Sequence, residues 1–462
     1  MLNPATPDFA AAFDLRAEPA PAAYLEEPRG IAQGAGLLVR PETTDEVAKI
    51  VCACAEARVG IVPYGGGTGL VGGQVAEGGP APLILSLERM TAIRAADPSA
   101  GTLTADAGAT LADVQAAAEN VDRLFPLSLA SEGTARIGGN LATNAGGVQV
   151  LRYGNARDLC LGLEAVMPDG SVLHGLTGLR KDNTGYDLRH LLIGSEGTLG
   201  IITAATLRLF PRPAEQVTAM APVASPAAAI SLLARLQEET GGMLTAFELI
   251  SGQGLHFLAE TMPQIRRIFD PTPDWMILTE AGAGRESGIT EAVTRGLMAG
   301  FEAGEALDVL VAQSGQQRDD FWNLRESIPS ANRAIGAISS HDISVPIGAT
   351  PAFLEKGAAA IAKLGPLRIN CFGHLGDGNL HYNMFPPAGQ NAADWRHLRG
   401  QVSAAVYDLV ADFGGSISAE HGIGRFKRAA LEKHGDPAKM AAMRAIKTAL
   451  DPHGIMNPGA VV

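Results

Sequence analysis

Cysteine, aromatic residues and long apolar runs are all scarce in this sequence. Four cysteines in 462 residues are too few for a disulfide framework, so the chain is not a small disulfide-rich secreted domain. No run of about 18 apolar residues occurs, and no transmembrane helix is expected. The amino terminus shows neither a secretory signal nor an arginine-rich transit peptide. Together these absences predict a reducing, cytoplasmic location.

Positive charge is also in short supply. Acidic residues outnumber basic ones by 49 to 36, and the formal net charge is −13. Such a surface repels phosphate backbones and anionic membranes, so a nucleic-acid partner is not expected. An anionic small substrate would need its own local cluster of positive charge. The apolar content, 46%, is that of an ordinary globular chain and excludes disorder.

Changes in composition and the positions of proline and glycine divide the chain into four segments, and the predicted helices and strands indicate an α+β fold. Short capped helices and short strands alternate up to the Phe210-Pro211-Arg212-Pro213 stretch, which neither a helix nor a sheet interior tolerates. Longer helical patterns alternate with strands after it. The segments are an Ala- and Pro-rich arm at 1–33, a glycine-rich domain at 34–213, a second α+β domain at 214–415 and a C-terminal segment at 416–462.

Three clusters of glycine and small residues lie in the 34–213 domain. The first follows a strand and holds six glycines in the nine positions from Gly65 to Gly73. Glycine admits positive φ and leaves backbone N–H groups uncovered, which suits a nest for phosphate oxygens. The cluster is neither a P-loop nor a Rossmann fingerprint, and alone it could be a flexible turn. Further clusters at 131–147 and 194–202 favour a long cofactor such as a dinucleotide.

Two histidines flank a hairpin signal in the second α+β domain. Asp377-Gly378 between apolar flanks predicts a two-residue type I′ turn. Counting outward pairs Gly376 with Asn379, Leu375 with Leu380 and His374 with His381. Directly opposed residues share a face about 4.5–5.5 Å apart at Cβ, and Phe372 and Asn383 fall on the same face. Two imidazoles so placed could bind one divalent ion, which we favour over a chance pairing.

A second constellation stands near the C-terminus. Ser418-Ala419-Glu420-His421 adds a carboxylate and a third imidazole at the end of an apparent strand. Two histidines and a glutamate with open positions form a catalytic rather than a structural ligand set, for Zn²⁺, Mn²⁺ or Fe²⁺.

The three glycine clusters, in this order, resemble the FAD-binding domain of vanillyl-alcohol-oxidase-type flavoproteins. More narrowly, the chain from about Val39 to Gly459 is similar to the FAD-linked D-2-hydroxyacid dehydrogenases, which include D-lactate and D-2-hydroxyglutarate dehydrogenases and the glycolate oxidase flavin subunit. The resemblance implies a two-subdomain FAD-binding domain at 34–213, a substrate-binding cap with an antiparallel sheet at 214–415, and a C-terminal segment that returns to the flavin. Non-covalent FAD is expected, because no histidine or cysteine stands in the 63–73 loop.

The resemblance also implies roles for individual residues. The residues implied to bind FAD are Pro63, Tyr64, Gly65, Gly66, Gly67, Thr68, Gly69, Leu70, Ser131, Gly138, Gly139, Asn140, Ala142, Thr143, Glu196, Gly197, Gly200, Ile201, Ile202 and Asn457. His374, His381 and Glu420 match the metal ligands of zinc-dependent members. His421 matches the base beside the glutamate, and Asn383 matches a substrate contact.

Arg325 matches the residue that binds the substrate carboxylate, a task suited to a planar guanidinium. The implied reaction removes the hydroxyl proton of a D-2-hydroxyacid and passes the C2 hydride to the flavin, giving the 2-oxo acid. A separate acceptor, a quinone, an electron-transfer flavoprotein or a cytochrome, would reoxidise the flavin. A homodimer is one assembly that fits this resemblance.

The sequence departs from the family pattern at three positions. D-2-hydroxyglutarate dehydrogenases carry a hydroxyl residue where this chain has Pro329, and many relatives carry a lysine where it has Ser340. That lysine would contact a second carboxylate, so a diacid substrate is in question. Ala460 stands where relatives often have lysine. Two alternatives stay open: the flavin subunit of a multi-chain glycolate oxidase, and a non-catalytic flavin- or metal-binding protein.

Overall fold

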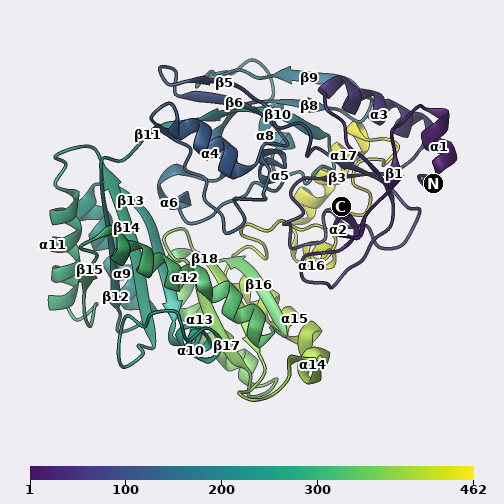
Figure 1. Ribbon diagram of the computed structural model, residues 1–462. Helices are drawn as coiled ribbons and strands as arrows, with labels where there is room; N and C mark the ends of the chain where they lie inside the picture. Colours follow the sequence, from purple (N-terminus) through teal and green to yellow (C-terminus); the bar gives the residue numbers. More distant parts are fainter. The chain divides into compact units, whose positions relative to one another are not determined.

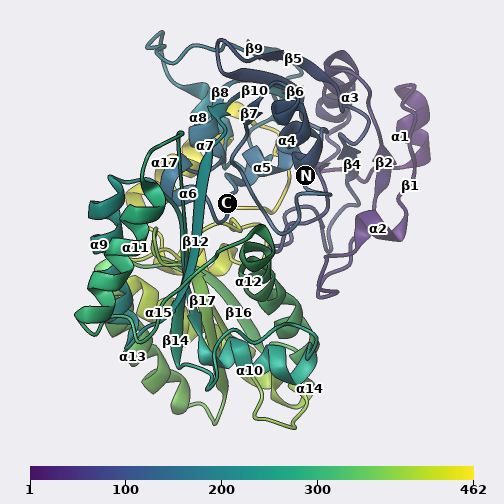
Figure 2. The same ribbon diagram turned by 60° about the vertical axis from the view of Figure 1, so that its left-hand side comes forward.

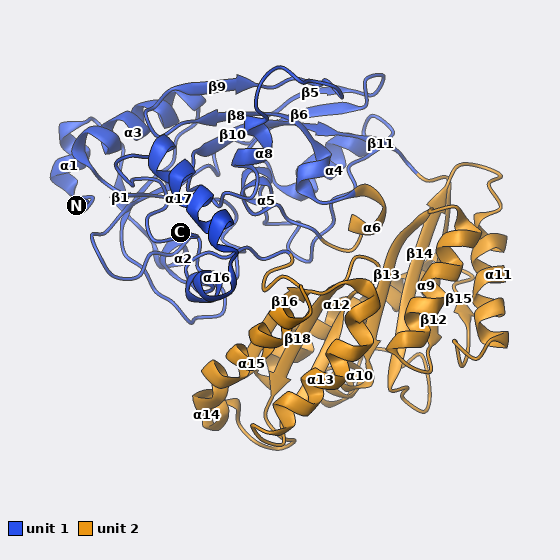
Figure 3. Ribbon diagram, turned by 180° about the vertical axis from the view of Figure 1, so that it is seen from behind, with its two compact units in different colours: residues 1–146, 154–212, 420–462 blue, residues 147–153, 213–419 orange.

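The computed structural model describes residues 1–462, which form two compact units (Figure 3). Unit 1 comprises residues 1–146, 154–212 and 420–462, and unit 2 comprises residues 147–153 and 213–419. In Figure 1 the yellow C-terminal helices lie beside the purple N-terminal segments of unit 1. The chain therefore ends in the unit in which it begins.

Unit 1 contains two main sheets. Its strands are β1 (Glu18–Pro19), β2 (Leu37–Val39), β3 (Ile61–Tyr64), β4 (Leu83–Ser86), β5 (Ile93–Asp97), β6 (Thr102–Asp106), β7 (Arg123–Leu124), β8 (Cys160–Val166), β9 (Val172–Gly175), β10 (Ile201–Arg208) and β11 (Phe210–Pro211). The first sheet has the order β1-β2-β4-β3, in which β2, β4 and β3 are parallel. The second is antiparallel, in the order β5-β6-β10-β8-β9, while β7 and β11 form a separate pair. These two sheets form the two subdomains of unit 1.

Short helices complete unit 1. They are α1 (Pro7–Ala12), α2 (Ala22–Leu25), α3 (Thr44–Ala57), α4 (Leu111–Glu119), α5 (Ile137–Thr143), α7 (Ala156–Leu159), α8 (Leu188–Leu192), α16 (Arg428–His434) and α17 (Pro437–Leu450). Thr43 caps α3, because its side chain accepts the Glu46 N–H. The Glu46 carboxylate accepts the N–H of Glu42, rather than that of Thr43 as a capping box would have it.

The C-terminal segment is built into the first sheet of unit 1. The Ile61 N–H donates to the Ile455 carbonyl at 2.7 Å, and the Asn457 N–H donates to the Ile61 carbonyl at 2.8 Å. Ile455 and Met456 are fully buried. The last residues of the chain are thus held beside β3, the strand that leads into the first glycine cluster.

Unit 2 is organised around one antiparallel sheet of seven strands in the order β15-β12-β14-β13-β17-β18-β16. The strands are β12 (Glu215–Pro222), β13 (Leu244–Ser251), β14 (Trp275–Ala283), β15 (Leu310–Val311), β16 (Ser339–Ser344), β17 (Arg368–His374) and β18 (Asn379–Phe385). The helices are α6 (Val150–Tyr153), α9 (Pro226–Thr240), α10 (Gly252–Thr261), α11 (Ile289–Glu302), α12 (Gly315–Ile335), α13 (Thr350–Ala362), α14 (Ala392–Trp395) and α15 (Arg399–Asp412), with 3-10 turns η1 (Ile347–Ala349) and η2 (Arg396–Leu398).

Helices lie on both sides of this sheet, with α9, α11, α13 and α15 on one side and α10 and α12 on the other (Figure 2). An apolar core under α10 and α12 includes Ile250, Phe257, Leu324 and Phe385, all buried. The predicted α+β class with an antiparallel sheet in the second domain is therefore confirmed. None of the helices is both long and apolar enough to cross a membrane.

The predicted hairpin register was wrong by two residues. Phe372, not His374, pairs with His381, because a loop from Leu375 to Gly378 replaces the two-residue turn. Within that loop the His374 carbonyl accepts the Asp377 N–H, and the Leu375 carbonyl accepts the Gly378 N–H. A shift of two residues leaves every side chain on its predicted face, since strand side chains alternate with period two.

Candidate active site

Most of the predicted cofactor residues line one pocket of unit 1. The pocket encloses about 990 Å³ when the solvent space at its open mouth is included. The predicted residues that line it are Pro63, Tyr64, Gly65, Gly66, Gly67, Thr68, Gly69, Gly138, Gly139, Asn140, Ala142, Thr143, Glu196, Gly197, Gly200, Ile201, Ile202 and Asn457. His421 lines the same pocket. The structure thus brings all three glycine clusters together, with the histidine that follows Glu420.

Two predicted residues, Leu70 and Ser131, do not line this pocket. The Leu70 carbonyl accepts a hydrogen bond from the Arg29 guanidinium, and the Ser131 carbonyl accepts the N–H groups of Thr134 and Ala135 in a turn. The lining also includes Gln74 and Arg136, which the sequence reasoning did not single out. Gln74 closes the glycine loop by donating to the Gly69 carbonyl at 2.8 Å.

The pocket wall is backbone because the first two glycine clusters touch. A Cβ atom on Gly66 would lie 2.1 Å from the Thr134 carbonyl oxygen, and one on Gly65 would lie 3.3 Å from the Gly139 Cα atom. A side chain at Gly66 would therefore displace backbone. The side-chain nitrogen of Asn140 is buried in the same wall without a hydrogen-bond partner. An open backbone wall with one unsatisfied amide fits a polar cofactor such as FAD.

Three side chains tie the C-terminal segment to the pocket. The Glu196 carboxylate accepts the N–H groups of Ile423 and Gly424 at 2.7 and 2.8 Å. The Arg425 guanidinium donates to the Gly72 and Gly73 carbonyls, both at 2.8 Å, and to Asn457 Oδ1. Burial raises the pKa of Glu196, against the opposing effect of these backbone bonds and of Lys427 and Arg425. This arrangement holds the loop that begins at His421.

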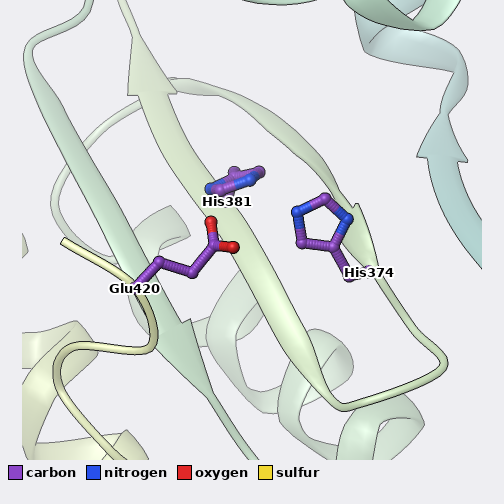
Figure 4. Close-up of side chains that lie close together, drawn as sticks. All are labelled: His374, His381 and Glu420. Carbon is purple, nitrogen blue, oxygen red and sulfur yellow. The ribbon is translucent and has the colours of Figure 1, made fainter. Parts of the chain in front are cut away.

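Three of the predicted side chains form a ligand group at the end of the unit 2 sheet. One ring nitrogen of His374, one ring nitrogen of His381 and one Glu420 oxygen lie within 4.8 Å of one another. Figure 4 shows the Glu420 carboxylate pointing toward the two imidazoles. The imidazole centroids are 5.5 Å apart and nearly perpendicular. Glu420 follows Ala419, whose N–H donates to the Asp342 carbonyl of β16.

Each imidazole of the group has a buried carboxylate at its Nδ1 atom. Glu248 Oε1 lies 2.6 Å from His374 Nδ1, and Asp342 Oδ1 lies 3.7 Å from His381 Nδ1. Metal-binding histidines commonly donate one ring N–H to a carboxylate, which orients the ring and leaves the other nitrogen as the ligand. The donor set, with Glu248 within hydrogen-bond distance of one imidazole and Asp342 near the other, therefore fits a divalent ion.

Arg325 lies beside this group and is almost completely buried. Its Nε and Nη2 atoms each lie 2.7 Å from Glu248 Oε2, and its guanidinium stacks 4.7 Å from the centroid of the Phe372 ring. Burial pushes the pKa of Glu248 up, but the neighbouring His374 and Arg325 outweigh burial and hold the pKa well below its usual range. The one strong cation in the site is thus anchored by an ionised glutamate.

The remaining predicted site residues lie on neighbouring strands. Asn383 Oδ1 accepts the His341 N–H at 3.2 Å, so the amide NH₂ is the end that Asn383 offers to a ligand. Ser340 pairs with Asn383 across β16 and β18 and is exposed. Sequence reasoning assigned no role to Glu248 or Asp342. The available signal was an isolated glutamate in the otherwise uncharged, buried strand Leu244–Ser251.

Two family comparisons cover most of the chain. Residues 35–175 match an FAD binding domain, and residues 212–461 match the C-terminal domain of FAD linked oxidases. A probable mitochondrial D-2-hydroxyglutarate dehydrogenase of Oryza sativa subsp. japonica is 36% identical over 428 residues, 91% of this chain and 74% of its own length. A D-2-hydroxyglutarate dehydrogenase of Xanthomonas citri pv. viticola is 38% identical over 425 residues, 91% of this chain and 87% of its own.

Among solved structures, the isoeugenol complex of 4-ethylphenol oxidase from Gulosibacter chungangensis superposes with a TM-score of 0.75. The match covers 100% of this chain and 98% of that one at 15% sequence identity, so it bears on the fold alone. Together with the matched FAD binding domain, this likeness confirms the predicted fold type, an α+β FAD-binding fold of the vanillyl-alcohol-oxidase type.

Proposed function

Because the chain belongs to the FAD-linked D-2-hydroxyacid dehydrogenases, we propose that it oxidises D-2-hydroxyglutarate to the 2-oxo diacid with the help of a divalent metal ion. The observation that carries the metal is the ligand group of His374, His381 and Glu420 with a carboxylate behind each imidazole. The names of the relatives support the diacid.

Each residue of the site is assigned one role in the proposed reaction. The pocket of unit 1 would hold FAD, which would supply the hydride acceptor, and His374, His381 and Glu420 would hold a divalent ion, with Zn²⁺ the first choice, which would supply a Lewis acid for the 2-hydroxyl. His421, which lines the flavin pocket, is proposed to take the hydroxyl proton. Arg325 is proposed to hold a substrate carboxylate, and the Asn383 NH₂ to donate a hydrogen bond. One proton and one hydride leave the substrate, as conversion of a hydroxyl into a ketone requires.

A shorter 2-hydroxyacid such as D-lactate is the second candidate substrate. Ser340 is exposed on the strand face that carries Asp342, at the position where a lysine would meet a distal carboxylate. Its short hydroxyl offers no charge there. The electron acceptor, a quinone, an electron-transfer flavoprotein or a cytochrome, and a cytoplasmic location stay predictions. The rice relative is named mitochondrial, and the Xanthomonas relative carries no compartment in its name.

An anaerobic titration of the flavin-loaded protein tests this proposal. D-2-hydroxyglutarate, L-2-hydroxyglutarate, D-lactate and glycolate are added with and without a strong chelator, and the flavin absorbance is followed. Rapid bleaching by D-2-hydroxyglutarate alone, abolished by chelator and restored by Zn²⁺, is the expected result. Bleaching by D-lactate alone would replace the diacid by the second candidate. Bleaching only by glycolate would favour the glycolate oxidase subunit, and bleaching unaffected by chelator would remove the metal.

A further inference from the structure

Glu248 is a fully buried carboxylate in the middle of β13, where its neighbours in sequence are apolar. Removing an ionised carboxylate from water costs several kcal/mol, which only close pairing offsets. Both oxygens of Glu248 are paired, and with different partners: Oε1 with His374 and Oε2 with Arg325. One side chain therefore joins a predicted metal ligand to the predicted substrate-binding arginine.

Strand register explains the first contact. Glu248 of β13 pairs directly with His374, the last residue of β17, so their side chains leave the sheet on the same face. Gly373 directly precedes His374 and has a φ of +154°. The loop after His374 leads away from the sheet, and the contact with Glu248 orients the imidazole at this strand end.

The second contact comes from above the sheet. Arg325 reaches Glu248 from α12, and the Phe372 ring lies between Arg325 and His381, with centroid distances of 4.7 and 4.9 Å. Any movement of Glu248 would therefore alter the positions of both the imidazole and the guanidinium. The carboxylate sets the spacing between a metal ligand and a cation that binds substrate.

A second buried glutamate on the neighbouring strand provides the contrast. Glu280 of β14 is 4% exposed and accepts hydrogen bonds from Thr218, Arg318 and Trp322 at 2.8–3.0 Å. It also pairs with an arginine of α12, but it has no histidine partner among its recorded bonds. Burial and an arginine are thus common to both glutamates, whereas the imidazole contact belongs to Glu248.

We propose that Glu248 is a positioning residue that holds His374 and Arg325 in one geometry, so that metal binding and substrate binding depend on the same carboxylate. This inference rests on the proposed function, in that His374 must bind a metal. Glu248 itself touches neither the substrate nor the ion. It acts through the two side chains that do.

The test compares Glu248→Gln with the matched control Glu280→Gln. Zinc is titrated into the metal-stripped, flavin-loaded proteins against a chromophoric chelator, and KM and kcat are measured after reloading. We expect Glu248→Gln to bind Zn²⁺ about 10- to 100-fold more weakly, because the loss of a carboxylate that supports a metal ligand typically has an effect of this size. We also expect the variant to have a higher KM for the hydroxyacid. Glu280→Gln should keep both values of the wild type even where its melting temperature falls. Wild-type Zn²⁺ affinity and KM in Glu248→Gln would overturn the inference.

Two further variants separate this inference from its premise. Arg325→Lys is expected to raise KM while leaving Zn²⁺ affinity unchanged. This result would distinguish the loss of the arginine that binds the substrate carboxylate from the loss of Glu248. If Glu248→Gln does not fold, Glu248→Asp keeps the charge but withdraws it by one methylene, and weaker Zn²⁺ binding is again expected. Wild-type protein that binds no Zn²⁺ would overturn the metal in the proposed function itself, and the inference with it. Zn²⁺ affinity equal to wild type in Glu248→Asp would overturn the inference alone.

Discussion

The glycine-lined pocket of unit 1 and the histidine-bearing face of the unit 2 sheet prepare for their ligands by opposite means. The pocket is walled by backbone, and its conformation depends on residues that have no side chain, such as Gly66. The sheet face presents two imidazoles and a guanidinium, and the buried carboxylate of Glu248 holds the guanidinium and one of the imidazoles. The backbone-lined pocket should therefore lose cofactor binding when a side chain is added to a glycine. The sheet face should lose metal or substrate binding when one of its side chains is truncated.

This difference predicts two kinds of mutational damage. In unit 1 even the smallest side chain at a contact between glycine clusters should displace backbone. In unit 2 the loss of one ligand should leave the sheet intact, because the strands are held by their ladders and by the core under α10 and α12. The four substitutions below test this contrast in order of decreasing effect.

The largest effect is expected from His374→Ala. Loss of one of three ligands should remove the metal and lower kcat by at least about 10³-fold, since metal polarisation supplies several kcal/mol to the transition state. The flavin content should stay that of the wild type. Metal analysis and the flavin-to-protein absorbance ratio check both points. His397→Ala, at an exposed histidine of η2, is the control, and a parallel loss of flavin in His374→Ala would contradict the contrast.

Gly66→Ala should produce the converse result. Its Cβ atom would lie 2.1 Å from the Thr134 carbonyl oxygen, and overpacking of this kind costs about 1–3 kcal/mol, or about 5- to 150-fold in FAD affinity. Zn²⁺ binding should be retained. Fluorescence titration of the deflavinated protein with FAD gives the affinity. Gly133→Ala has open space around its Cβ atom and should bind FAD normally, and normal binding by Gly66→Ala as well would show that the wall adapts.

Arg325→Lys is expected to raise KM about tenfold. A lysine cannot reproduce the two contacts that Nε and Nη2 make with Glu248 Oε2, and a bidentate arginine is worth about 1–2 kcal/mol more than a point charge in such a site. Steady-state kinetics with the best hydroxyacid give the value, and the flavin spectrum should not change. Arg318→Lys, on the same helix but paired with Glu280, serves as the reference. An unchanged KM would remove Arg325 from substrate binding.

The smallest effect is expected at Ser340. Ser340→Lys places a cation on the exposed strand face next to Asn383, and a partly exposed charge pair is worth about 1 kcal/mol, or roughly fivefold in KM for a diacid. D-lactate should be unaffected. The ratio of the two kcat/KM values measures the effect, and Ser231→Lys on α9 controls for added charge. An equal change for both acids would show that Ser340 does not face the distal carboxylate.

The sequence predicted the backbone-walled site better than the side-chain face. The glycine clusters can be identified directly in the sequence, and eighteen of the twenty residues that the family resemblance implied line one pocket. Arg425, which ties the C-terminal segment to this pocket, carries no such signal because any surface arginine looks the same in sequence. On the sheet face the histidines could be identified, but Glu248 could not be joined to His374, since 126 residues separate them and only strand order brings them together.

The faces of the two hairpin strands were predicted correctly, whereas the hairpin register was not. Alternation along β17 and β18 indicated the correct face, whereas the turn type depended on whether Asp377-Gly378 closed the hairpin alone. In the structure the Asp377 N–H donates to the His374 carbonyl and the Gly378 N–H donates to the Leu375 carbonyl, and these bonds form in place of the tight two-residue turn. The length of the loop therefore could not be predicted from Asp377-Gly378 alone.

The register between β17 and β18 has a consequence for how the pair of histidines can be kept over evolution. A register shift of two residues slides one strand past the other and leaves both histidines on the same side of the sheet. A shift of one residue turns one imidazole to the opposite face, away from its partner. Homologues that keep both histidines as ligands should therefore differ in this register only by even numbers, whatever the length of the loop.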